Sequence, residues 1–126
     1  MTFNSKTVLV IDDNPLMRKA LRALFEGAGY RCAEAESGPQ GLELAEELRP
    51  DVIVLDFSMP VMNGLEAAPL FKRKFPQTPI IMFTLFATDG LAKVATSAGI
   101  TAVVSKETAA IQLIPKIESI LNPSTG

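Results

Sequence analysis

The stretch Val52-Ile53-Val54-Leu55-Asp56-Phe57-Ser58-Met59-Pro60 places a carboxylate directly after four apolar residues. Consecutive apolar residues rich in Val and Ile indicate a strand that is buried on both faces. Asp56 then stands where a central strand leaves the core, which is the edge at which open α/β sheets bind ligands. From this stretch alone, Asp56 is a candidate metal ligand, a candidate nucleophile or an ordinary loop residue.

The chain has 126 residues, of which 48% are apolar, and this favours a single globular domain that spans residues 1–126. Its longest nearly apolar run, Pro79–Ala87, is far shorter than the roughly 20 residues of a membrane-spanning helix, so no membrane association is expected. A net charge of −2 argues against nucleic-acid binding.

Two features of the composition indicate a cytoplasmic protein without histidine chemistry of its own. The N-terminal stretch Met1–Lys6 does not resemble a signal peptide, and the single cysteine, Cys32, suits a reducing compartment and a role as a small core residue. Because the chain has no histidine, catalysis by histidine or a phosphohistidine must come from a partner.

Apolar strand-like runs alternate with segments of helical periodicity. The strand-like runs are Thr7–Ile11, Tyr30–Ala35, Val52–Leu55, Pro79–Phe83 and Thr101–Val104, the second being the weakest. The helical faces include Met17, Leu21, Leu24 and Phe25; Leu42, Ala45 and Leu48; and Ile111, Ile114, Ile117 and Leu121. Five strand–helix units predict a parallel sheet with helices on both faces and right-handed crossovers.

Residue pairs typical of helix starts precede three of the predicted helices. Asn14-Pro15 provides a cap and a first-turn proline, while Ser37 with Gln40 and Asn63 with Glu66 have capping-box spacing. Helix ends are expected near Gly27, Gly29 and Gly99.

Two prolines fall inside predicted helices. Pro69 should remove one backbone bond and kink the third helix. Pro115 should do the same to the fifth, unless that helix begins with a short turn and restarts at the proline.

Polar side chains follow four of the strands. Asp12 and Asp13 come after the first, Asp56 after the third, Thr84 after the fourth and Lys106 after the fifth. The carboxyl ends of parallel strands meet at one edge, where three carboxylates would repel one another without a cation. An all-oxygen, partly hydrated site favours Mg²⁺, and carboxylates form acyl-phosphate intermediates. Lys106 and Thr84 could stabilise a transferred phosphoryl group.

These five positions, together with Met59-Pro60-Val61-Met62-Asn63-Gly64, resemble the receiver domain of two-component response regulators over about residues 6–121, which would be the core of the domain. The resemblance implies a flavodoxin-like (βα)5 doubly wound sheet in the order 2-1-3-4-5. It also implies that Asp56 accepts a phosphoryl group from a histidine kinase or phosphotransfer protein, and that the chain catalyses only its own phosphorylation and dephosphorylation.

The resemblance further implies the ligands, the partners and the output surface. Asp13, Asp56 and the backbone carbonyl of Ser58 would hold Mg²⁺, and Asp12 would assist through water. Phosphorylation would alter docking of a downstream protein on the fourth helix, fifth strand and fifth helix. The regulator would stand alone as a monomer or weak homodimer.

Three positions depart from the family pattern. Val103 stands where many receivers carry a switch Tyr or Phe, which leaves Phe86 as the candidate ring or as a packing residue. Leu85 replaces the usual small residue after Thr84, so it should narrow access to Asp56. Glu107 stands where many members have a cis proline, and a trans bond is expected there.

Two other functions remain open. A receiver-like module could bind a partner without phosphorylation, with affinity indifferent to Asp56→Asn. An enzyme on a similar sheet is disfavoured: a haloacid dehalogenase-type phosphatase needs a second Asp where the chain has Ser58. In a flavodoxin, Asp12 and Asp13 would repel the flavin phosphate.

Overall fold

The computed structural model describes residues 6–85 and 87–122. Five strands alternate with five helices along the chain. In order they are β1 (Thr7–Ile11), α1 (Pro15–Gly27), β2 (Arg31–Ala35), α2 (Gly38–Leu48), β3 (Val52–Asp56), α3 (Gly64–Lys74), β4 (Ile80–Thr84), α4 (Asp89–Ser97), β5 (Ala102–Ser105) and α5 (Ala109–Leu121). The predicted strand–helix alternation is confirmed.

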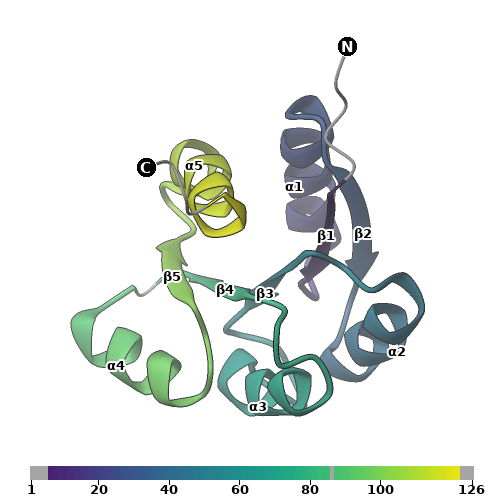
Figure 1. The fold of residues 1–126 in the computed structure, drawn as a ribbon. Helices are drawn as coiled ribbons and strands as arrows, with labels where there is room; N and C mark the ends of the chain where they lie inside the picture. The colour runs from purple at the N-terminus through teal and green to yellow at the C-terminus, as the bar shows by residue number, and fades with distance from the viewer. Residues whose placement is uncertain (1–5, 86, 123–126) are drawn as a thin grey trace.

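All strand pairs are parallel, and the sheet order is β2-β1-β3-β4-β5, as the resemblance implied. Helices α1 and α5 cover one face of this sheet, and α2, α3 and α4 cover the other (Figure 1). The fold is therefore a three-layer, flavodoxin-like sandwich with β3 at its centre.

Alternate residues of the central strands supply the two halves of the core. Leu9, Ile11, Ile53 and Leu55 pack with α2, α3 and α4, whereas Val8, Val10, Val52 and Val54 pack with α1 and α5. All eight side chains have no exposed surface. Burial on both faces explains why these strands read as unbroken apolar runs.

The predicted helix caps form. The Asn14 side chain accepts from the N–H groups of Leu16 and Met17, and the Ser37 side chain accepts from the Gln40 N–H. The Gln40 side chain accepts from the Glu36 N–H, so the second half of the predicted Ser37–Gln40 box is displaced by one residue. Asn63 and Glu66 make a reciprocal capping box, which ends the loop after β3 in a defined orientation. Gly29 and Gly99 adopt φ values of 92° and 93°, consistent with chain reversals after α1 and α4.

The two internal prolines lie in continuous helices. Pro69 is inside α3, and Pro115 is inside α5, which does not restart there. Each proline removes one backbone donor, yet both helices continue because buried residues on either side, such as Phe71, Leu113 and Ile117, anchor them to the sheet.

Cys32 lies in β2, half-buried against the α1 side of the core, as a small packing residue. Burial raises the pKa of its thiol to about 11. Within the described part of the chain, no helix combines the length and the apolar character needed to cross a membrane.

Candidate functional site

Three carboxylates meet at the carboxyl edge of the sheet, where β1 and β3 end side by side. One oxygen from each of Asp12, Asp13 and Asp56 lies within 4.8 Å of the others. Asp12 and Asp56 are buried, and Asp13 is exposed. We call these three residues the acidic edge. The strand-end pattern predicted this convergence, and the structure places the three carboxylates together.

Lys106 brings a positive charge to the acidic edge from the loop after β5. Its Nζ lies 2.9 Å from Asp56 Oδ1 and 3.8 Å from Asp12 Oδ2. The lysine side chain is 14% exposed, so water screens these contacts only partly. Its ammonium also sits 5.0 Å from the centre of the Phe83 ring. Lys106 is therefore oriented towards the carboxylates, as predicted, rather than towards bulk solvent.

Asp12 is in an unfavourable setting for a charge. Burial raises its pKa to about 6, and the nearby Asp56 carboxylate pushes the pKa in the same direction. The Asn14 N–H opposes this shift by donating to Asp12 Oδ1 at 2.8 Å. Among residues 6–85 and 87–122, Asp12 Oδ2 is the buried side-chain oxygen without a hydrogen-bond partner. The Lys106 ammonium, 3.8 Å away, is too distant to supply a hydrogen bond, and a buried oxygen without one is costly unless a further cation or water interacts with it.

The loop after β3 brings its backbone very close to Asp56. The Ser58 N–H donates to Asp56 Oδ1 at 3.3 Å, and the Gly64 N–H donates to the Phe57 carbonyl at 2.9 Å. A Cβ on Gly64 would lie 2.8 Å from the Asp56 backbone oxygen, so only glycine permits this approach. Val61, at the loop tip, is 99% exposed and has a φ of 71°, a strained value for a β-branched residue.

Thr84 ends β4 beside the acidic edge and is 1% exposed. The register pairs Asp56 with Phe83, so Thr84 follows one residue beyond the partner of Asp56. Its carbonyl accepts the Lys106 N–H at 2.8 Å. The loops after β4 and β5 are thus tied together next to Asp56. Both residues lie at the edge where the strand ends predicted them.

The donor set fits Mg²⁺. All three clustered side chains offer carboxylate oxygens, the ligands that this hard cation prefers, and Asp12 Oδ2 is an oxygen with unused acceptor capacity. Ser58, whose carbonyl was predicted as a further ligand, lies two residues beyond Asp56, and its participation stays a prediction.

The positions that differ from the family pattern are Leu85, Val103 and Glu107, with Phe86 as the alternative switch ring. The described residues include no cis peptide bond, so the Lys106–Glu107 bond is trans, as expected. Leu85 is 57% exposed beside Thr84, and its effect on access to Asp56 stays a prediction. Phe86, the candidate switch ring, lies outside the described residues.

Sequence reasoning missed Arg18, whose guanidinium Nη1 donates to the Asp12 backbone carbonyl at 2.6 Å. The signal available was an arginine one turn into a helix that starts just after an acidic pair. That spacing is too common in helices to single out a residue, and only the packing of α1 against β2 makes it informative.

Comparison with known proteins gives consistent matches over nearly the whole chain. It is 34% identical over 119 residues to the polar-differentiation response regulator DivK of Brucella ovis, a match covering 93% of this chain and 97% of DivK. It is 38% identical over 117 residues to a protein-glutamate methylesterase/protein-glutamine glutaminase of Hahella chejuensis, covering 92% of this chain but 31% of that protein.

Solved structures agree with the sequence relatives. The chemotaxis protein CheY4 of Vibrio cholerae superposes with a TM-score of 0.88 at 28% identity, covering 94% of this chain and all of CheY4. The family model described as the response regulator receiver domain matches residues 8–118. The fold, the acidic edge at its carboxyl end and these matches together show that the chain belongs to the response regulator receiver domain family.

Proposed function

We propose that this receiver domain accepts a phosphoryl group on Asp56 from the phosphohistidine of a histidine kinase or phosphotransfer protein. The observation that carries the proposal is the position of Lys106 Nζ, 2.9 Å from Asp56 Oδ1 within a cluster of three carboxylates. An ordinary surface ion pair joins one lysine to one acid, whereas here three clustered carboxylates share one ammonium.

The chemistry follows from the side chains at the acidic edge. An Asp56 carboxylate oxygen attacks the phosphorus, the phosphorus–nitrogen bond of the donor breaks, and an acyl phosphate forms while the donor imidazole leaves with the electron pair. The Lys106 ammonium offsets negative charge on the phosphoryl oxygens, and the Thr84 hydroxyl donates to one of them. Positioning and charge supply most of what this transfer requires.

Asp13, Asp56 and the Ser58 carbonyl would hold Mg²⁺, with Asp12 acting through water. When bound, Mg²⁺ neutralises the acidic edge and the incoming phosphate. The chain would act in the cytoplasm, where phosphohistidine donors of kinases are made, and would catalyse only its own phosphorylation and dephosphorylation.

Mass spectrometry after incubation with Mg²⁺ and acetyl phosphate tests this function. The wild-type chain should gain one phosphoryl group, and Asp56→Asn should gain none. Asp89→Asn, which alters an exposed acid in the first turn of α4, is the matched control and should be phosphorylated normally. Failure to form an adduct with acetyl phosphate or with any histidine kinase would overturn the proposal.

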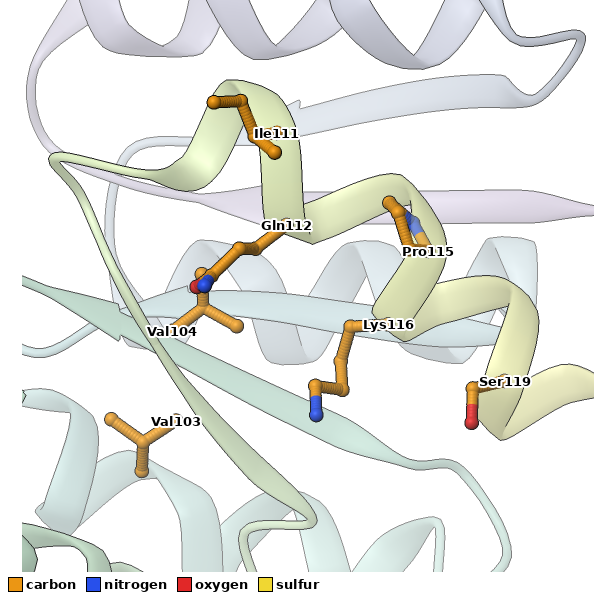
Figure 2. Close-up of a pocket in the computed structure, with 7 residues that line it drawn as sticks. All are labelled: Val103, Val104, Ile111, Gln112, Pro115, Lys116 and Ser119. Atoms are coloured by element: carbon orange, nitrogen blue, oxygen red, sulfur yellow. The ribbon is translucent and has the colours of Figure 1, made fainter.

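We further propose that a downstream protein docks on the side of the molecule formed by α4, β5 and α5. A hollow of about 370 Å³ lies there, lined by Val103, Val104, Ile111, Gln112, Pro115, Lys116 and Ser119 (Figure 2). We call it the β5–α5 hollow. Ile111 is 77% exposed at its rim, and Val94 on α4 is 53% exposed, so apolar surface is available to a partner.

The alternative is a module that binds its partner without phosphorylation. It predicts that the conformation of this surface does not change when Asp56 is phosphorylated. Beryllofluoride with Mg²⁺ mimics the acyl phosphate and allows a direct comparison. Methyl NMR signals of Val103 and Ile111 should shift on its addition to the wild-type chain, and not on its addition to Asp56→Asn. Unchanged signals in a wild-type chain that binds beryllofluoride would favour the alternative. Sedimentation in the same two states would show whether the chain is a monomer or a weak homodimer.

A further inference from the structure

Arg18, in the second turn of α1, reaches back to the acidic edge without belonging to it. Its Nη1 donates to the Asp12 carbonyl at 2.6 Å, and its Nε donates to Glu34 Oε1 at 3.3 Å. The Arg18 side chain is only 15% exposed. A guanidinium held through two different nitrogens by acceptors on β2 and in the loop after β1 has little freedom to move.

Glu34 is what fixes this guanidinium. It lies in β2, and its second oxygen accepts from Arg22 Nε, while Arg22 also pairs with Glu26 at 2.9 Å. The hydrogen bond from Arg22, followed by that from Arg18, lowers the pKa of Glu34, so Glu34 is ionised at neutral pH. Two arginines and two glutamates leave this network with no net charge.

The accepting carbonyl belongs to the peptide that joins Asp12 to Asp13. The Asp12 and Asp13 side chains stand on the two Cα atoms that this single peptide unit joins, so a rotation about ψ of Asp12 or φ of Asp13 would turn one carboxylate relative to the other. Mutual repulsion of the carboxylates of Asp12, Asp13 and Asp56 favours such a rotation, because turning outwards would separate the charges. A fixed donor on the carbonyl opposes it.

We propose that Arg18 is a positioning residue, held by Glu34, that keeps the Asp12–Asp13 peptide oriented so that both carboxylates face Asp56. The inference rests on the proposed function only in naming Mg²⁺ as the ion that the carboxylates receive. Arg18 touches neither the phosphoryl group nor the ion, and it acts through the backbone of Asp12.

A purely electrostatic role predicts the opposite result from a positioning role. Arg18→Gln removes a positive charge near the acidic edge, so electrostatics alone would make Mg²⁺ bind more tightly. If the guanidinium positions the peptide, Mg²⁺ should bind about 3- to 10-fold more weakly, somewhat less than the 10- to 100-fold typical when a direct partner of a metal ligand is lost. The direction of the change therefore separates the two roles.

Arg22→Gln is the matched control. It makes the same charge change one helical turn further along α1 and also breaks a pair with Glu34, but Arg22 forms its hydrogen bonds and ion pairs with Glu34 and Glu26, not with Asp12. Mg²⁺ titration followed by backbone amide NMR should give wild-type or slightly tighter binding for Arg22→Gln. Arg18→Lys keeps the charge and should recover part of the affinity. Arg18→Gln binding Mg²⁺ as tightly as the wild type would overturn the proposal.

A second measurement needs no metal. The Asn14 N–H is held by Asp12 Oδ1, so its hydrogen exchange in EDTA reports on the orientation of the acidic pair. Exchange should be several-fold faster in Arg18→Gln than in Arg22→Gln, even where their thermal stabilities match. Equal exchange in the two variants would contradict the proposal. If the wild-type chain itself failed to bind Mg²⁺, the proposed function would fail, and this exchange comparison would still decide the role of Arg18.

Discussion

The acidic edge, at the ends of β1 and β3, and the β5–α5 hollow are built differently. The acidic edge holds two buried carboxylates and an Asp12 oxygen that has no hydrogen bond. The loop beside it contains Gly64, pressed against the Asp56 backbone, and the strained Val61. The hollow is bordered by β5 and by ordinary helical side chains of α5. The contrast indicates that the residues at the site of chemistry lower the stability of the fold. The docking surface carries no such cost and consists of side chains exposed to solvent.

The largest expected effect comes from Asp12→Asn, and it depends on pH. The pKa of Asp12 is raised from 3.8 to about 6, so the folded chain binds this proton more tightly than the unfolded chain does. The free energy of unfolding should therefore be highest below pH 4 on this account, and fall by about 3 kcal/mol as the pH rises through 6.

Asp12→Asn has no ionisable group at this position, so its free energy of unfolding should not fall as the pH rises through 6. In EDTA at pH 7 it should be more stable than the wild type by about 2–3 kcal/mol, while binding Mg²⁺ more weakly. Urea unfolding at several pH values measures both trends. An Asp12→Asn chain less stable than wild type at pH 7 would show that the carboxylate is not under strain.

Gly64→Ala should destabilise the edge by steric conflict. The new Cβ would lie 2.8 Å from the Asp56 carbonyl oxygen and 3.1 Å from Phe57 Cα, both backbone atoms that cannot move independently. We expect a loss of about 1–3 kcal/mol in the free energy of unfolding, together with slower phosphorylation from acetyl phosphate.

Gly90→Ala is the matched control for that substitution. Its Cβ would meet nothing closer than 4.0 Å, so Ala should stabilise α4 by about 0.5 kcal/mol. If Gly64→Ala and Gly90→Ala changed the free energy of unfolding equally, the close approach of Gly64 to Asp56 would make no contribution to stability.

Val61→Asn should relieve strain at the loop tip. Asn tolerates a φ of 71° better than Val does, and the Val61 side chain is 99% exposed, so little packing is lost. A gain of about 1 kcal/mol in the free energy of unfolding is expected from urea denaturation. A destabilised variant would mean that Val61 makes a contact that offsets its backbone strain.

Ile111→Asp, at the rim of the β5–α5 hollow, should have the smallest effect on the isolated chain. The side chain is 77% exposed near the start of α5, where a negative charge suits the helix dipole. Stability should change by less than about 0.5 kcal/mol, and Mg²⁺ affinity should not change. A large change in Mg²⁺ affinity would show that the two regions are coupled even without phosphorylation.

Most of the fold could be predicted because its signals are local. Apolar runs predicted the bounds of all five strands to within one residue, and the Asn14 and Asn63 caps marked the starts of α1 and α3. The direction of the sheet then brought Asp12, Asp13, Asp56 and Lys106 together, because parallel strands share one carboxyl edge. The behaviour of Pro69 was harder to foresee, since tertiary packing holds α3 together across the missing hydrogen bond.

Other features depend on distances that no local pattern encodes. Arg18 matters only because Glu34, on a different strand, holds it against the Asp12 carbonyl. The need for Gly64 comes from the path of the loop after β3, which passes the Asp56 carbonyl. The hollow beside β5 depends on how the side chains of α5 pack beside Val103 and Val104, which are distant in sequence from most of its lining.

The reactivity of the Cys32 thiol should distinguish folded from unfolded molecules. With its pKa raised to about 11, only about one thiol in ten thousand is a thiolate at neutral pH, and the thiolate is the reactive form. Folded molecules should therefore resist alkylating reagents and air oxidation. A covalently linked dimer on a non-reducing gel would then identify chains that had lost their native structure, rather than a pair formed by native association.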